Sequence, residues 1–190
     1  METKNIMIVG VGGQGTLLAS KLLGRILLDK GYDVKVSEVH GMSQRGGSVV
    51  TYVRYGDKVY SPIVDEGEAD IVLSFELLEA ARWAGHLKKG GVLLTNTQKM
   101  NPMPVITGAA EYPSELEDKL SKLDIKLDTM NALELAEKAG SAKTVNVVLL
   151  GRLSRYFDFD KEAWLDAIEK SVPEKFKEMN KRAFELGAEL

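Results

Sequence analysis

The sequence predicts an α/β fold with three layers, in which helices cover both faces of a mostly parallel, Rossmann-like sheet. Three observations indicate this fold. Short apolar runs alternate with helical stretches, as in α/β proteins. Glycine-bearing loops follow the first two apolar runs, where open α/β sheets bind ligands. The last third has only helical spacing, so we expect a helical C-terminal extension over residues 144–190 of one 190-residue domain.

The first part of the chain predicts strands around one long helix. The apolar run at residues 6–9 is typical of a buried strand, and residues 14–30 have the spacing of a helix. Residues 34–39 are expected to form the next parallel strand. Residues 48–55 are rich in β-branched and aromatic side chains, as a strand requires, and we expect residues 58–60 to return antiparallel to them.

The middle of the chain continues the alternation of strands and helices. We expect strands at residues 70–74, 91–96 and 124–128. We expect helices at residues 76–87, 114–123 and 131–139. Gly90 and Gly91 are expected to end the first of these helices. Ser114 and Glu117 have the spacing of a capping box at the start of the second.

The last third predicts three consecutive helices, because apolar side chains recur there at helical spacing. These series begin near Val145, Trp164 and Phe176. Ser171 and Glu174 form a second predicted capping box.

Charge and hydropathy narrow the class of protein. The net charge is −3 and no run of lysine and arginine occurs, so we expect no nucleic-acid partner, because such binding depends on clustered cations. No apolar stretch approaches the ~20 residues that cross a bilayer, and the N-terminus lacks the pattern of a signal peptide. We therefore expect a soluble, cytoplasmic protein with no membrane association.

The absence of cysteine limits the chemistry further. With zero cysteines the chain can form no disulfide and can provide no thiolate for an iron–sulfur cluster. Its two histidines, His40 and His86, lie far apart and lack the spacing of a zinc motif. We expect no metal site in this chain.

The first glycine loop has the spacing of a dinucleotide-binding fingerprint, with Gly10, Gly12 and Gly15 between a strand and a helix. The helix N-terminus would attract an anion there, although the glycines could equally serve only tight packing. Glu38 falls 23 residues after Gly15 and could bind a ribose, which leaves a free-standing NAD(P)-binding oxidoreductase as an alternative. Gln14 could cap its own backbone or reach a ligand.

The second glycine loop combines polar side chains with accessible backbone. Arg45 precedes Gly46 and Gly47, which suits phosphate or carboxylate. His40 could titrate near neutral pH, but it could also be a hydrogen-bonded surface residue, and Arg45 could pair with Glu38. We expect the two loops to form one composite site.

The candidate site is therefore a set of loop residues, with His40 and Arg45 as the candidate catalytic groups. The predicted substrate- or coenzyme-binding residues are Gly12, Gly13, Gln14, Gly15, Glu38, Gln44, Arg45, Gly46 and Gly47. Asn146, near the start of a predicted helix, could cap the helix, line the site or touch a partner.

At these residues the chain resembles a known family, the gamma-type domain of the 2-oxoacid:ferredoxin oxidoreductases. A strand leads into Gly-Gly-Gln-Gly at residues 12–15, and Arg-Gly-Gly follows at 45–47. Residues 37–49 and 59–62 are most similar to the beta subunit of the indolepyruvate branch. The resemblance also includes residues 68–70 and 146–151, so that it covers nearly the whole chain.

The resemblance implies oxidative decarboxylation of an aryl 2-oxoacid with coenzyme A, giving an acyl-CoA, CO2 and reduced ferredoxin. It also implies thiamine diphosphate, Mg and [4Fe-4S] clusters. Because this chain has no cysteine and lacks the family's Gly-Asp-Gly thiamine motif, these groups would belong to a cysteine-containing alpha subunit. This chain would then complete the site without carrying a cofactor, and would be inactive alone. A purely structural interaction subunit is the remaining alternative.

Overall fold

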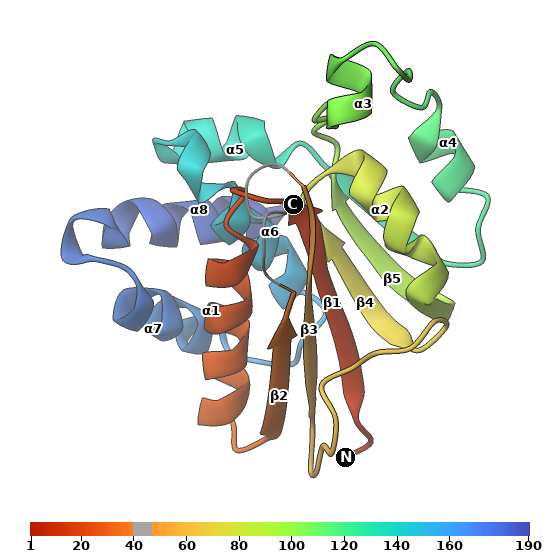
Figure 1. The fold of residues 1–190 in the computed structure, drawn as a ribbon. Helices are drawn as coiled ribbons and strands as arrows, with labels where there is room; N and C mark the ends of the chain where they lie inside the picture. Colours follow the sequence, from red (N-terminus) through yellow and green to blue (C-terminus); the bar gives the residue numbers. More distant parts are fainter. Residues whose placement is uncertain (40–46) are drawn as a thin grey trace.

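A six-stranded sheet forms the centre of the computed structural model, which describes residues 1–39 and 47–190 (Figure 1). The strands lie in the order β2-β3-β1-β4-β5-β6. Their bounds are β1 Lys4–Val11, β2 Asp33–Glu38, β3 Ser48–Gly56, β4 Ala69–Ser74, β5 Leu87–Asn96 and β6 Lys126–Met130. β3 is antiparallel to both neighbours, and the other strands all run in one direction. The predicted mostly parallel sheet is confirmed.

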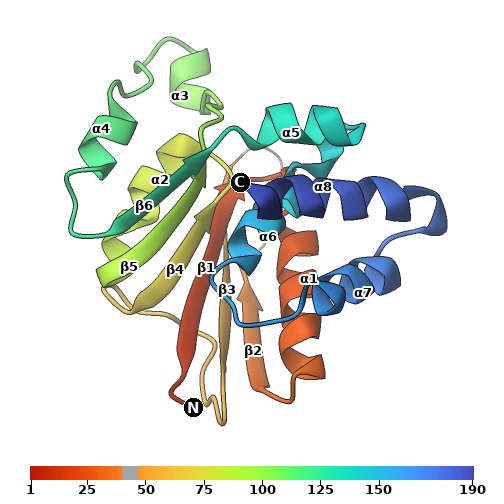
Figure 2. The ribbon, with the colours of Figure 1, turned by 180° about the vertical axis from the view of Figure 1, so that it is seen from behind.

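Helices cover both faces of this sheet, so the predicted three layers are also confirmed (Figures 1 and 2). One face carries α1 (Thr16–Asp29), α5 (Ala132–Ala139), α6 (Val145–Ser154), α7 (Lys161–Ser171) and α8 (Lys177–Glu189). The other face carries α2 (Leu77–Trp83) and α4 (Leu116–Leu120). The short helix α3 (Met103–Ile106) lies beyond the strand ends (Figure 1). Short 3-10 turns span Ala84–His86, Ala142–Thr144 and Glu174–Phe176.

Strand β1 joins the two hydrophobic clusters. Ile6 and Ile8 pack with the layer that contains α1 and α6, while Met7 and Val9 pack with the layer that contains α2. All four side chains are buried. A strand covered on both faces has no polar side to show, which explains its continuous apolar run.

The predicted antiparallel return at residues 58–60 is wrong, because these residues form no strand. The antiparallel strand of the sheet is instead β3, which precedes these residues. β3 runs back between β2 and β1, pairing Ser48 with Val11 at one end and Gly56 with Asp33 at the other. The alternation of apolar and polar side chains indicates that a segment is a strand, but it does not indicate the direction of that strand in the sheet.

The predicted helix over residues 76–87 is too long. α2 ends at Trp83, a single 3-10 turn follows, and Leu87 already pairs with Ala69 as the start of β5. Gly90 and Gly91 therefore lie inside a strand, beside a register shift, and not after a helix. Glycine serves a β-bulge as well as a helix end.

Both predicted capping boxes are wrong. Glu115, not Ser114, is the N-cap residue of α4, and its side chain makes no capping bond. Ser171 closes α7, while α8 begins at Lys177 after the 3-10 turn. The three C-terminal helices themselves are confirmed, as is the helix after Asn131. Within the described residues, none of the helices is both long and apolar enough to span a membrane.

Helices α6 and α8 cross in direct backbone contact. A Cβ atom built on Gly151 of α6 would lie 2.1 Å from the carbonyl oxygen of Phe184. A Cβ on Gly187 of α8 would lie 2.0 Å from the carbonyl oxygen of Val148. No side chain can rotate away to relieve either contact, so the two glycines are required by space.

We expect Gly151→Ala to lower the free energy of unfolding by about 3 kcal/mol or more, because the added methyl group forces the two helix backbones apart. Urea denaturation measures this loss. Gly85→Ala is the matched control, since no neighbouring atom among residues 1–39 and 47–190 lies within 4 Å of a Cβ there. Equal denaturation midpoints for the two variants would contradict the close crossing.

Asp70 links β1, β4 and β5 near the end of the sheet where these three parallel strands begin. Its carboxylate accepts the Asn5 N–H at 2.9 Å, lies 3.4 Å from the Lys4 Nζ and also pairs with Lys88. Burial alone would raise the pKa of this carboxyl. The bonds from Lys88 and the Asn5 N–H, with the charge of Lys4, outweigh that effect, so the pKa of Asp70 lies below its ordinary value.

A carboxyl whose pKa is lowered by folding stabilises the protein at a pH above its unfolded-state pKa, and this stabilisation disappears in acid. We expect Asp70→Asn to cost about 1 kcal/mol at pH 7. The gap between variant and wild type should stay constant down to about pH 5 and then close as the pH falls below 3.8, the ordinary value. Denaturant midpoints measured from pH 7 to 2.5 check this, and a gap that does not change with pH would refute it.

Candidate functional site

The site lies at the edge of the sheet where β1 and β2 end. The glycine loop, residues 12–15, connects β1 to α1. The Gly12 N–H donates to the carbonyl oxygen of Gly47 at 2.8 Å, so the start of the first loop is bonded to the described end of the second. His40, Gln44, Arg45 and Gly46 lie outside the described residues.

The backbone of the glycine loop requires glycine at two positions. Gly13 and Gly15 have φ angles of 101° and 85°, in the left-handed region that other residues rarely adopt. Gly15 is the N-cap residue of α1 and has no side chain to cover the helix end. Gly15 therefore leaves the positive end of α1 without a side-chain cap of its own, as in an anion-binding helix.

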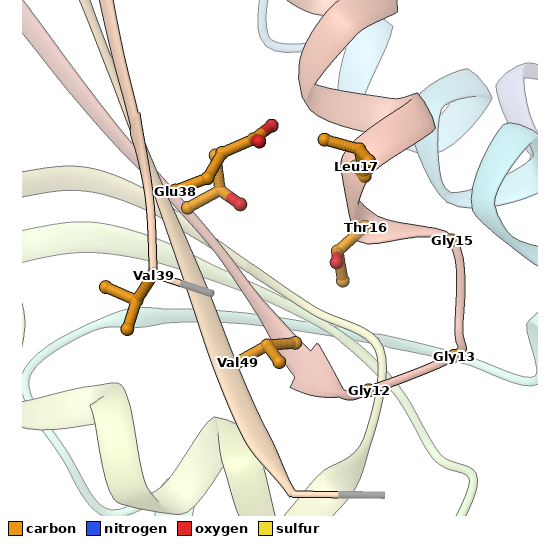
Figure 3. Close-up of a pocket in the computed structure, with 9 residues that line it drawn as sticks. Gly12, Gly13, Gly15, Thr16, Leu17, Glu38, Val39 and Val49 are labelled. Carbon is orange, nitrogen blue, oxygen red and sulfur yellow. The ribbon is translucent and has the colours of Figure 1, made fainter. Parts of the chain in front are cut away.

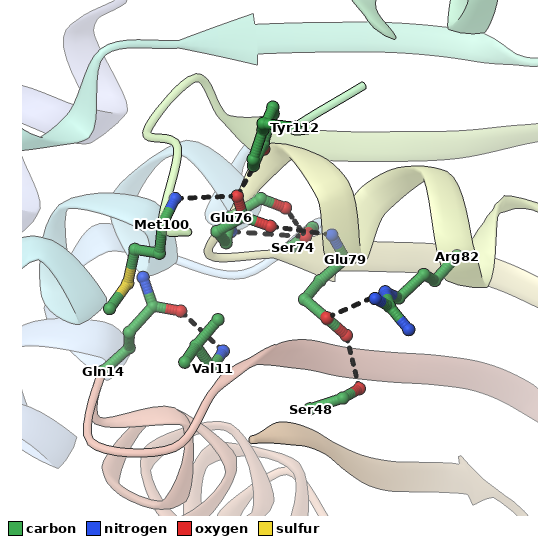
Figure 4. Close-up of polar contacts among 9 residues, drawn as sticks. All are labelled: Val11, Gln14, Ser48, Ser74, Glu76, Glu79, Arg82, Met100 and Tyr112. Carbon is green, nitrogen blue, oxygen red and sulfur yellow. Dashed lines mark hydrogen bonds and ion pairs between the residues drawn. The ribbon is translucent and has the colours of Figure 1, made fainter. Parts of the chain in front are cut away.

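The Gln14 side chain bonds to the chain at the ends of two neighbouring strands, β1 and β4. Its Oε1 accepts the Val11 N–H at 2.7 Å (Figure 4). Its Nε2 donates to the carbonyl oxygen of Phe75 at 3.1 Å and lies 3.5 Å from Oε1 of Gln98. The amide thus caps its own loop and fastens the loop to the chain that follows β4.

Two cavities share the glycine loop as a wall. The first, here called the β2 cavity, has a volume of about 300 Å³ (Figure 3). It is lined by Gly12, Gly13, Gly15, Thr16, Leu17, Glu38, Val39, Val49 and Thr51. The second, the α5 cavity, has a volume of about 570 Å³. It is lined by Gly12, Gly13, Gln14, Gly15, Gln98, Met100, Leu133, Ala142, Lys143 and Val145.

The two cavities differ in the charge of their described walls. Glu38 lines the β2 cavity, where its Oε1 accepts the Ser20 hydroxyl at 2.9 Å. Lys143 lines the α5 cavity together with the apolar side chains of Met100, Leu133 and Val145. A ligand with an anionic group and an apolar arm suits the α5 cavity, because Lys143 and the N-terminus of α1 both favour negative charge.

Two buried carboxylates beside the site were missed by the sequence analysis (Figure 4). Glu76 is 1% exposed, and its carboxylate accepts the Glu79 N–H at 2.8 Å, the Met100 N–H at 3.0 Å and the Tyr112 hydroxyl at 2.5 Å. These bonds hold Met100, a wall of the α5 cavity. Glu76 could have been recognised by its place just beyond the end of β4 at Ser74, at the edge where open α/β sheets bind ligands.

Glu79 lies in a third cavity, of about 440 Å³, between α2 and α3. Burial raises the pKa of its carboxyl, while the hydrogen bond from Ser48 and the charge of Arg82 oppose that rise. Arg82 Nε lies 3.3 Å from Glu79 Oε1, and the Ser48 hydroxyl donates to the other oxygen. These contacts connect α2 to the start of β3.

The residues present do not suit an iron–sulfur cluster, because the sequence contains no cysteine. Across residues 1–39 and 47–190, no three histidine, aspartate or glutamate side chains converge to hold a metal ion. What the β2 and α5 cavities offer is a surface of backbone and side chains that includes Glu38, Lys143 and the N-cap residue of α1.

Comparison with known proteins identifies the family. The chain is 48% identical over 192 residues to the indolepyruvate oxidoreductase subunit IorB of Thermococcus kodakarensis, covering 98% of this chain and 95% of that protein. It is 47% identical to the subunit of the same name from Pyrococcus horikoshii, with the same coverage. The solved gamma subunit of a keto/oxoacid ferredoxin oxidoreductase from Geobacter sulfurreducens has a TM-score of 0.73 and 25% identity, covering 98% of this chain and 96% of that one. Residues 5–190 match the pyruvate ferredoxin/flavodoxin oxidoreductase family, and the chain belongs to that family.

Proposed function

We propose that this chain is the site-completing subunit of a heteromeric, cytoplasmic indolepyruvate:ferredoxin oxidoreductase. The observation that carries the proposal is the near-full-length similarity to subunits named for indolepyruvate, at 48% and 47% identity. Residues 1–190 would act as one gamma-type domain, including the helices after residue 144. The reaction would convert an aryl 2-oxoacid and coenzyme A into an acyl-CoA, CO2 and reduced ferredoxin.

The redox groups would belong to a partner chain. A [4Fe-4S] cluster needs thiolates, and this chain has none. A cysteine-containing alpha subunit would bind the clusters, thiamine diphosphate and Mg, and would transfer electrons to ferredoxin. The present chain would supply a binding wall and would be inactive alone.

The α5 cavity is our candidate for the coenzyme A site. Coenzyme A combines phosphates with a long, largely uncharged arm. The N-terminus of α1 and Lys143 would attract the phosphates, while Met100, Leu133 and Val145 offer apolar contact to the arm. Gly12 and Gly13 have no side chains, so a ligand can approach the loop backbone closely.

The alternative of a free-standing NAD(P)-binding oxidoreductase is supported by Glu38, which lines the same cavity as Gly12 and Gly15. The strand order counts against it. In the dinucleotide fold the strand that carries the ribose-binding acid lies next to the first strand, whereas here β3 lies between β1 and β2. Thermal unfolding with NAD or NADP tests the alternative, because a ligand at ~100 times its Kd should add ~2.7 kcal/mol of stability.

We expect Lys143→Gln to raise the KM for coenzyme A about threefold to tenfold in the assembled enzyme, with kcat little changed, because a charged hydrogen-bond donor is lost from the ground-state contact. The measurement is ferredoxin reduction by the co-expressed subunits with indolepyruvate as the oxoacid. Lys170→Gln is the control, because it makes the same change in net charge. Lys170 pairs with Asp166 on the exposed side of α7.

Equal KM values for coenzyme A in the two lysine variants would contradict the proposal that coenzyme A binds in the α5 cavity. Failure of this chain to co-purify with a cysteine-containing partner would contradict the proposed function itself. Turnover with full coenzyme A affinity in both variants would favour the purely structural subunit.

A further inference from the structure

We infer that Asn146 is a positioning residue for the glycine loop, and that it aims the N-terminus of α1 at the ligand. The inference rests on the proposed function for its kinetic consequence. Asn146 is the second residue of α6 and is only 4% exposed. It lies 131 residues away from the loop in sequence.

Both ends of the Asn146 amide have backbone partners. Nδ2 donates to the carbonyl oxygen of Gly15 at 3.3 Å, and Oδ1 accepts the Val147 N–H at 3.0 Å. The reversed amide would place oxygen against oxygen at Gly15 and nitrogen against nitrogen at Val147. The neighbours therefore dictate which way the amide points.

The Gly15 carbonyl is where the loop becomes a helix. Gly15 has left-handed angles, φ 85° and ψ 22°, and its oxygen also accepts the N–H groups of Leu18 at 3.2 Å and Ala19 at 3.3 Å. A trans peptide is planar, so its N–H points opposite to its carbonyl. By fixing the Gly15 carbonyl, Asn146 fixes Gly15 itself, which lines the α5 cavity, and the direction of the Thr16 N–H at the N-terminus of α1.

The same contact explains why residue 15 must be glycine. A Cβ atom there would lie 2.8 Å from Nδ2 of Asn146. The asparagine can reach the carbonyl only because no side chain stands in the way. The contact between Gly15 and Asn146 thus joins the C-terminal helical layer to the glycine loop.

Asn180 offers a matched control elsewhere in the same layer. It is 7% exposed, and its Nδ2 donates to the carbonyl oxygen of Phe176 at 2.8 Å, within the start of α8. Both asparagines are buried donors to a backbone carbonyl. Removal of either donor should cost stability, but only Asn146 contacts the glycine loop.

The test compares Asn146→Asp and Asn146→Ala with Asn180→Asp and Asn180→Ala in the assembled enzyme. Aspartate keeps the size of the side chain and can still accept the Val147 N–H, but it turns an oxygen toward the Gly15 carbonyl. We expect both Asn146 variants to raise the KM for coenzyme A about tenfold and to change kcat by less than about twofold. The Asn180 variants should lower the unfolding temperature without raising this KM. KM values that change equally at both positions, or at neither, would overturn the inference.

A second measurement does not depend on turnover. Hydrogen exchange in the full chain alone should show faster exchange at residues 16–19 in Asn146→Asp than in Asn180→Asp. If Asn146→Asp exchanges faster than Asn180→Asp but the wild-type chain supports no oxoacid turnover, the positioning role stands and the proposed function is rejected. Normal turnover and KM with equal exchange in both variants would reject the positioning role and leave the proposed function standing.

Discussion

The burial of α6 on all sides is the constraint on which the rest of the structure depends. Eight of its ten residues are buried, so it has no face for water. A helix of this kind must be covered by neighbours around its whole circumference. One neighbour is the layer beside the sheet, which includes α1, and another is α8, whose backbone touches α6 at Gly151. The C-terminal helices are therefore part of the main core.

This packing also brings the core and the proposed binding site together at one end of α6. Val145, its first residue, lines the α5 cavity, and Asn146, its second, holds the glycine loop. A shift of α6 would move both walls at once. The loop is bound from the other side by Gln14, which reaches Phe75 after β4. One amide within the loop, that of Gln14, and one from α6, that of Asn146, thus fasten the loop to two other parts of the chain.

Much of the fold could be predicted because the decisive patterns are local. The apolar run of β1 and the glycines before α1 need only neighbouring residues to be recognised, and both are found where expected. The direction of β3 could not be predicted, since alternation is the same for parallel and antiparallel strands. The predicted helix end at Gly90 and Gly91 was wrong for a related reason, because glycine is common both at β-bulges and at helix ends.

The site shows the same division between local and distant information. The special backbone at Gly13 and Gly15 follows from the motif, but the contacts of Glu76 with Met100 and Tyr112 depend on chain segments that meet only in the fold. These distant contacts matter for the proposed site because they would order its surface before a ligand arrives. A loop that is already fixed loses little conformational entropy on binding, so more of the interaction energy remains as affinity. A subunit that provides such a surface contributes to a reaction through binding and orientation, which requires no cysteine.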